Sequence, residues 1–358
     1  MSHRMPRRTF LCGLLLRTGV PLLGASVPST GWASTPEPAQ PTEATGPITG
    51  AAGAPLEKVR MACWSQPIAE QANIYAAQEH GWFRDEGLEF AFVPGAGGGD
   101  ALKHVLAGNA DLAFTNLEPV FFALDQGSKL RAVYNIYPQN VFNVLALKDK
   151  GVTQPKDLKG KKVGVYSKAS GTYHNLLVLL RSAGLKEADV EVVASGVNNF
   201  GPLVQGQVDA QAATDTGLFL ARQQGLGEVD TIWVRDYLNT PSDAFVVAEE
   251  TFQARQDSLR RFLRAYRRGS QWMLDNPQQA AELARKYAID GQDAARNLGI
   301  IELRNASTVN DDTRVRGLGW FNLDVLRQVE RALFDLGLIE NRVNVKDVFT
   351  NDLSEALG

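Results

Sequence analysis

The sequence contains few cysteines and histidines, and this scarcity narrows the chemistry that the chain can perform. Its 358 residues include two cysteines, Cys12 and Cys63, and four histidines. Cys12 lies in a segment typical of a cleaved export signal, so Cys63 would remain alone, without a disulfide or a multi-cysteine metal site. The histidines lack paired metal-ligand spacing, and no Gly-x-Ser-x-Gly nucleophile motif occurs. We therefore expect no cofactor, no metal, no catalytic residues and no enzymatic activity.

Neither sign of charge dominates, and no basic stripe interleaved with aromatic residues is present. Lys and Arg number 37 against 40 for Asp and Glu, which gives a net charge of -3. This balance argues against a nucleic-acid partner. Hydrophobic residues make up 44% and charged residues 22% of the chain, so the composition is globular and the length suits two domains.

The apolar segment near the N-terminus is short and interrupted, so the chain lacks a long hydrophobic run there. Residues 1–34 have a cationic start, an apolar middle interrupted by Arg17, and small residues at a possible cleavage site. This pattern predicts a signal peptide and a soluble periplasmic protein, because the apolar middle is too short to remain as a membrane span. Arg7-Arg8 resembles a twin-arginine signal, while general secretion stays open. Residues 35–57, rich in Pro, Ala, Thr and Gly, are predicted to form a flexible linker.

A weak internal repeat organises the rest of the chain. Residues 59–83 and 163–185 each follow the pattern of a short strand, a polar loop and a helix that ends at a glycine. The segment "LAGNAD" at 106–111 has its counterpart in "VQGQVD" at 204–209. The alternation of strands and helices predicts two α/β lobes with largely parallel sheets, facing each other across a ligand cleft.

The lobe boundaries follow from two apolar segments, 140–150 and 242–252, that suit crossover strands. We assign residues 58–147 plus 244–358 to the first lobe and 148–243 to the second. From residue 257 onward the apolar spacing is mostly helical, which predicts C-terminal helices packed on the first lobe. The arginines of these helices are interpreted as solvated faces.

A glycine-rich loop stands out between a strand and a helix of the first lobe, with four glycines in residues 95–99. It is not a P-loop or a dinucleotide fingerprint, because Asp100-Ala101 follows the last glycine. Asp100 can cap the helix, whose free amides would suit an anion or a carbonyl-rich ligand. The alternative interpretation is a tight turn that binds no ligand.

Loops that follow strands supply the remaining candidate contacts. Trp64 is either core or a stacking platform, Glu118 either binds a ligand or caps a helix, and residues 167–172 offer hydroxyls and amides at a helix start. The predicted ligand-binding residues are Trp64, Ser65, Gln66, Gly97, Gly98, Gly99, Asn116, Glu118, Ser167, Ser170, Gly171, Thr172, Asn198 and Asp215.

Six segments in order resemble the periplasmic substrate-binding proteins of ABC uptake transporters in the nitrate/sulfonate/taurine family, which includes binders of thiamine-related pyrimidines. They are "AAQEHGWFRDEGLEFAFVPG" (76–95), "LAGNADLAF" (106–114), "DLKGKKVGV" (157–165), "LLRSAGLKEADVEVV" (179–193), "VQGQVDAQAA" (204–213) and "VFTNDL" (348–353).

The resemblance implies a type II two-lobed binding protein, monomeric, that captures a small solute and delivers it to an inner-membrane permease with its ATPase. Trp64 matches the pyrimidine branch, whereas "SKASGT" (167–172) offers the hydroxyls and amides that nitrate and sulfonate binders use. Nitrate, sulfonate or taurine, and pyrimidine or thiamine-precursor ligands all stay open. The alternatives are an enzyme related to the pyrimidine-precursor synthase of thiamine biosynthesis and a periplasmic ligand sensor.

Overall fold

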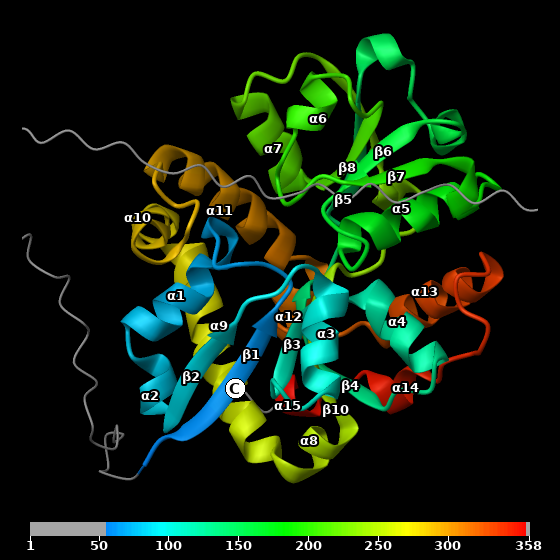
Figure 1. Cartoon of the computed structure of the whole chain (residues 1–358). Coiled ribbons are helices and arrows are strands. Elements are labelled where there is room, and N and C mark those ends of the chain that lie inside the picture. The colour runs from blue at the N-terminus through cyan, green and yellow to red at the C-terminus, as the bar shows by residue number, and fades with distance from the viewer. Residues whose placement is uncertain (1–54, 356–358) are drawn as a thin grey trace, which may run out of the picture. The chain divides into compact units, whose positions relative to one another are not determined.

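A computed structural model of the chain describes residues 55–355. The predicted signal peptide, its Cys12 and the predicted linker up to residue 54 lie outside the described residues. Within 55–355, two five-stranded sheets with flanking helices form the two lobes (Figure 1). The predicted two-lobed α/β fold is confirmed. No helix in the described part of the chain combines the length and apolarity needed to cross a bilayer.

The first-lobe sheet has the order β2-β1-β3-β10-β4. β1, β2 and β3 are parallel, and β10 is antiparallel to β3 and β4. β3 is buried along its whole length because helices cover both faces of the sheet. The strands are β1 (Glu57–Cys63), β2 (Leu88–Val93), β3 (Leu112–Asn116), β4 (Leu130–Tyr137) and β10 (Asp243–Ala248).

The second-lobe sheet repeats this plan in the order β7-β6-β8-β5-β9, with β5 antiparallel to β8 and β9. Its strands are β5 (Phe142–Leu147), β6 (Lys162–Val165), β7 (Glu191–Ala194), β8 (Ala210–Thr214) and β9 (Val229–Trp233). β5 differs from the expected division, which assigned residues up to 147 to the first lobe. It joins the second sheet because its backbone pairs with β8 and β9.

The helices lie in two groups. Those of the second lobe are α5 (Gly171–Ser182), α6 (Gly201–Val204) and α7 (Asp215–Gln223). The others are α1 (Ala72–Glu79), α2 (Trp82–Asp85), α3 (Gly98–Leu106), α4 (Leu117–Asp125), α8 (Glu249–Ala254), α9 (Gln256–Asp275), α10 (Pro277–Tyr287), α11 (Ala294–Thr308), α12 (Asp311–Arg316), α13 (Leu323–Asp335), α14 (Val345–Val348) and α15 (Asp352–Glu355). Short 3-10 helices are η1 (Ala69–Gln71), η2 (Lys148–Lys150), η3 (Pro155–Leu158), η4 (Glu187–Asp189) and η5 (Val234–Asp236).

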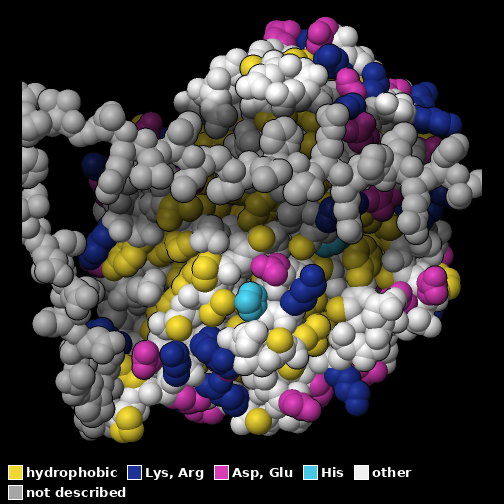
Figure 2. All heavy atoms as spheres, viewed as in Figure 1, with side chains coloured by type: hydrophobic (Ala, Val, Ile, Leu, Met, Phe, Trp, Pro, Cys, Tyr) yellow, Lys and Arg dark blue, Asp and Glu magenta, His cyan; other side chains and the backbone are white. Residues whose placement is uncertain are grey.

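The C-terminal helices pack on the first lobe, as the helical spacing predicts. α9 lies against α1, α2 and the β1–β2 edge, and α14 and α15 lie against β4 (Figure 1). α11 also contacts α7 of the second lobe. On the face drawn in Figure 2, acidic and basic side chains are interspersed rather than separated by sign.

Two chain segments connect the sheets and are tied to each other. The Ser242 amide donates to the Tyr137 carbonyl over 2.9 Å, and the Ser242 hydroxyl accepts from the Val141 amide over 2.9 Å. The Asn140 amide donates to the Asn239 side-chain oxygen over 3.0 Å. These bonds join the outgoing and returning connections into one two-stranded hinge between the lobes.

We predict that Gly269→Ala destabilises the fold by about 1–3 kcal/mol, because overpacking forces helices apart. A Cβ at Gly269 of α9 would lie 2.2 Å from the Asn73 carbonyl oxygen of α1. Urea unfolding measures the change. Gly227→Ala is the control, because a Cβ there meets no atom within 4 Å. Equal midpoints for the two variants would contradict the prediction.

Candidate functional site

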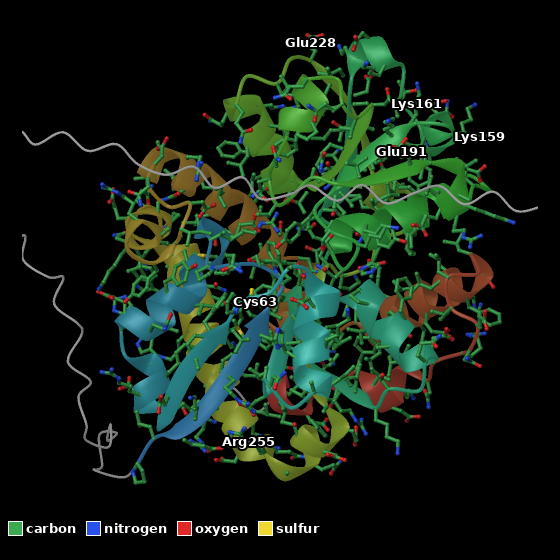
Figure 3. All side chains as sticks on the ribbon, in the orientation of Figure 1. Cys63, Lys159, Lys161, Glu191, Glu228 and Arg255 are labelled. Atoms are coloured by element: carbon green, nitrogen blue, oxygen red, sulfur yellow. The ribbon has the colours of Figure 1, made fainter. Side chains whose placement is uncertain are left out.

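A cavity lies between the two lobes, next to the carboxyl ends of β1, β3 and β6. Figure 3 places Cys63, the last residue of β1, at the end of that strand facing the second lobe, with Arg255 at the opposite end. The first lobe lines the cavity with Trp64, Glu70, Gly97, Gly98, Asn116, Asp243 and Arg304. The second lobe and the adjoining hinge contribute Val141, Phe142, Tyr166, Ser170, Gly171, Thr172, Gly196, Val197, Asn198, Asn199, Phe200, Gln211, Ala212, Ala213 and Thr214.

The glycine loop, residues 95–99, contacts the serine loop of the other lobe, residues 167–172. The Gly99 amide donates to the Ala169 carbonyl over 2.9 Å, and the Ser167 hydroxyl donates to the Ala96 carbonyl over 2.6 Å. A Cβ at Gly97 would lie 2.5 Å from the Ala169 oxygen, and Gly97 has φ +140°. The missing side chains therefore let two backbones meet, whereas sequence reasoning assigned these glycines to the approach of a ligand or to a tight turn.

Two hydroxyls of the serine loop hold that loop in shape. Ser170 Oγ donates to the Ser167 carbonyl over 2.6 Å and accepts from the Tyr173 amide at the start of α5. Thr172 Oγ1 lies 2.7 Å from Ser170 Oγ and accepts from the Tyr166 amide over 3.0 Å. Capping of α5 and lining of the cavity are thus combined in the same residues.

Asp243 is a buried cavity residue that sequence reasoning missed. Its side chain is 3% exposed, and Asn116 Nδ2 donates to Oδ1 over 2.7 Å. Burial raises the pKa of Asp243 well above its usual range, and the nearby Glu118 and Glu70 carboxyls add to that rise. The available signal was its position at the start of the returning crossover segment. An acidic residue at the first position of an otherwise apolar strand had not been weighed as a contact.

Arg304 corrects the interpretation that the C-terminal arginines form solvated faces. It lies on α11, is 1% exposed and forms an ion pair with Asp215 of the second lobe. Its guanidinium lies 3.9 Å from Glu70 and 5.0 Å from the Tyr137 ring centre. Helical spacing could not identify this residue, because its partner Asp215 comes from a distant part of the sequence.

Two further hydrogen bonds join the lobes around this ion pair. Thr216 Oγ1 donates to Glu70 Oε1 over 2.7 Å, and Ser307 Oγ donates to Asp215 Oδ2 over 3.1 Å. Each bond pairs a residue of α7 in the second lobe with η1 or α11. We call Glu70, Arg304, Ser307, Asp215 and Thr216 the polar bridge; it lies at one side of the cavity.

Eight of the predicted ligand-binding residues line the cavity: Trp64, Gly97, Gly98, Asn116, Ser170, Gly171, Thr172 and Asn198. The other six have different positions. Gly99 and Ser167 form the loop-to-loop contact, and Asp215 belongs to the polar bridge.

Ser65, Gln66 and Glu118 lie away from the cavity lining. Ser65 is buried, donates to the Gln66 carbonyl and accepts from Gln71 Nε2 over 2.7 Å, so it shapes its own loop. The Gln66 side chain is exposed. Glu118 is buried on α4, on the side of the first lobe that meets α5.

The cavity combines aromatic surfaces with buried hydrogen-bonding atoms. Trp64, Phe142, Tyr166 and Phe200 all line it. Within residues 55–355, neither Trp64 Nε1 nor Gln211 Oε1 has a hydrogen-bond partner. A flat ligand with both donors and acceptors on its edge would satisfy these atoms.

Residues 68–280 match the protein family described as NMT1/THI5 like. The riboflavin-binding protein RibY of Chloroflexus aurantiacus is 25% identical over 354 residues, covering 97% of this chain and 98% of that protein. The formylaminopyrimidine-binding protein of Halalkalibacterium halodurans is 25% identical over 239 residues, covering 63% and 69%. The 4-amino-5-hydroxymethyl-2-methylpyrimidine phosphate synthase THI5 of Saccharomyces cerevisiae is 22% identical over 230 residues, covering 60% and 66%.

Solved structures share the fold. A protein of Bordetella bronchiseptica RB50 has a TM-score of 0.69 at 23% identity and covers 84% of this chain and 96% of its own. The alkanesulfonate-binding protein SsuA from Xanthomonas axonopodis pv. citri, bound to MOPS, has a TM-score of 0.62 at 17% identity, covering 83% and 99%. The nitrate-binding protein NrtA from Synechocystis has a TM-score of 0.63 at 12% identity, covering 84% and 88%. The resemblance found in the sequence is confirmed.

We predict that the double variant Gly99→Cys/Ala169→Cys forms an inter-lobe disulfide under mild oxidation. A Cβ at Gly99 would lie 3.7 Å from the Ala169 Cβ, within the range of disulfides. Buried Cys63 does not compete, because burial raises the pKa of its thiol to about 12. Oxidation should lower the radius of gyration measured by X-ray scattering until disulfide formation is complete. Addition of a reductant should restore the original value.

Gly99→Cys/Gly227→Cys is the control for this experiment. Gly227 lies in the second lobe between α7 and β9, and a Cβ there meets no atom within 4 Å. The control should stay reduced. A first pair that also stays reduced would show that the lobes do not reach this contact in solution.

Proposed function

Because the chain belongs to the NMT1/THI5-like family, we propose that it is an exported solute-binding protein that captures a flat nitrogen heterocycle. The proposed ligand is of the pyrimidine or isoalloxazine class. The lobes close over it in the periplasm and present it to an ABC permease with its ATPase. Contacts from both lobes exist together only in the closed state, so the ligand stabilises closure.

One observation carries the choice of ligand class: the cavity lining holds two carboxyl side chains and a single basic side chain. Glu70 and Asp243 both line it. Arg304 is the basic side chain in the lining, and it is already paired with Asp215. A nitrate or sulfonate group would meet no free basic side chain in this lining, and unpaired buried charge is costly. A heterocycle with N–H groups and ring nitrogens instead pairs with these carboxyl groups, which can donate as well as accept when protonated, and it stacks on the aromatic lining.

The printed names of two relatives agree with this class, because riboflavin and formylaminopyrimidine are both flat nitrogen heterocycles. A pyrimidine-phosphate synthase is the second candidate, favoured by the likeness to the yeast enzyme. A ligand sensor would use the same cavity. Turnover assays distinguish a synthase from a binder, since a binder releases its ligand unchanged.

Thermal-shift measurements test the ligand class directly. We expect formylaminopyrimidine, 4-amino-5-hydroxymethyl-2-methylpyrimidine or riboflavin to raise the melting temperature, because a ligand that binds only the native state stabilises it. Nitrate and taurine should cause no shift. The opposite pattern, with a shift from an anion and none from the heterocycles, would contradict the proposal.

For the heterocycle that binds, we predict that Asp243→Asn lowers affinity by about 10- to 100-fold, because the new amide leaves a buried polar group of the ligand without its partner, at a cost of about 1–3 kcal/mol. Isothermal titration measures the change. Asp149→Asn makes the same chemical substitution at an exposed position of η2 and should leave affinity unchanged. Equal affinities for the two variants would remove Asp243 from the binding site.

A further inference from the structure

A second contact between the lobes lies away from the polar bridge, where α4 of the first lobe packs on α5 of the second. Glu118 and Phe122 are one turn apart on α4 and share a face. The Phe122 ring meets the His174 ring of α5 edge-on, with centroids 5.3 Å apart. Asn175, the next residue of α5, lies beside the Glu118 carboxyl. Each titratable side chain is therefore covered by the opposite lobe.

Both side chains are buried without the partners that a charge requires. Glu118 is 0% exposed, and no basic side chain within residues 55–355 forms an ion pair with it; the neutral amides of Asn175 and of its own main chain offset only part of the effect of burial on its pKa. His174 is 8% exposed, and its Nδ1 lacks a hydrogen-bond partner among these residues. The ion pairs of the described chain include none between the two. Burying an unpaired charge is costly, whereas the neutral forms are tolerated.

Few other charges reach this contact. β3 carries no titratable side chain, and Asp243 of β10 is the carboxyl that interacts with Glu118. The neighbouring α3 carries Asp100, Lys103 and His104, of which Lys103 is exposed. Near His174, the Lys168–Glu187 ion pair lies at the surface. η3 and η5 also pack on α5; their Lys156, Arg235 and Asp236 are exposed, and Asp157 accepts hydrogen bonds from Thr153. None of these supplies a positive charge to Glu118, and the Glu118 carboxyl is one of the causes that raise the pKa of Asp243.

We propose that Glu118 and His174 form a titrating pair that lets the lobes close only when both side chains are uncharged. When the lobes separate, water reaches both groups and each charged form is restored. When the lobes close, one proton leaves the His174 imidazolium and one proton joins the Glu118 carboxylate. Closure in this intermediate pH range therefore exchanges no net proton with solvent. This inference concerns closure itself and does not depend on the identity of the ligand.

The two groups have opposite effects on the pH dependence of closure. Burial raises the pKa of Glu118 from 4.5 to about 7, so Glu118 disfavours closure increasingly as pH rises from 4.5 to 7. Burial lowers the pKa of His174 from 6.5 to about 4, so His174 disfavours closure increasingly as pH falls from 6.5 to 4. The two slopes largely cancel between pH 4.5 and 6.5, so closure is insensitive to pH over this range.

Single substitutions should reveal the opposite pH dependences of closure that Glu118 and His174 contribute. In the Gly99→Cys/Ala169→Cys background, the disulfide equilibrium with glutathione reports the closed population without any ligand. The equilibrium constant for disulfide formation is measured for Glu118→Gln, for His174→Asn and for the combined variant. Each constant is divided by that of the parent background at the same pH. This ratio cancels the effect of the ionisation of glutathione. Glu250→Gln, at an exposed glutamate of α8, is the control.

From pH 4.5 to 7.5 we expect the Glu118→Gln ratio to rise and the His174→Asn ratio to fall, each on the order of 100-fold. The combined variant should change by only a few-fold, and Glu250→Gln should not change. Ratios that stay constant in both single variants would overturn the proposal, as would slopes of the same sign. Because no ligand is present, failure here leaves the proposed heterocycle binding untouched, and failure of the ligand assays leaves this result standing.

Discussion

The closed arrangement depends on the approach of one backbone to another, where the glycine loop of the first lobe meets the serine loop of the second. The Gly99 amide reaches the Ala169 carbonyl because Gly97 has no side chain to occupy the same space. This hydrogen bond between main-chain groups of two lobes sets the distance between the loops at the point where they meet. The cavity, the polar bridge and the α4–α5 contact all require this separation.

Around the cavity, the two other lobe contacts stabilise closure in different ways. The polar bridge pairs opposite charges, so Arg304 and Asp215 compensate each other when water leaves. The α4–α5 contact has no such compensation, and its Glu118 and His174 must lose their charges instead. Both solutions follow from the same cost of burying charge. The hydrogen bonds at Asn140 and Ser242 tie together the two segments that connect the lobes.

Several features of the fold could be predicted from sequence because they depend on local patterns. The repeat of strand, loop and helix indicated two similar sheets, and the apolar segments near 140–150 and 242–252 indicated the crossovers. The position of β5 could not be predicted, because the sequence of an apolar strand does not indicate which of two sheets it joins. The pairing of β5 with β8 and β9 places it in the second sheet. Eight of the predicted ligand residues line the cavity because loops at the carboxyl ends of parallel strands gather at one edge.

The sequence by itself determined the two-lobed architecture, the glycine and serine loops, and the likeness to solute-binding proteins, because these depend on spacing along the chain. Tertiary structure alone decided which charges meet. Arg304 faces Asp215, and Asp243 interacts with Glu118 and Glu70, only after folding brings together segments that lie far apart in sequence. The acidic character of the cavity, and with it the choice of a heterocycle over an anion, follows from these pairings. Electrostatic energy depends on distance and burial, and neither can be read from residue order.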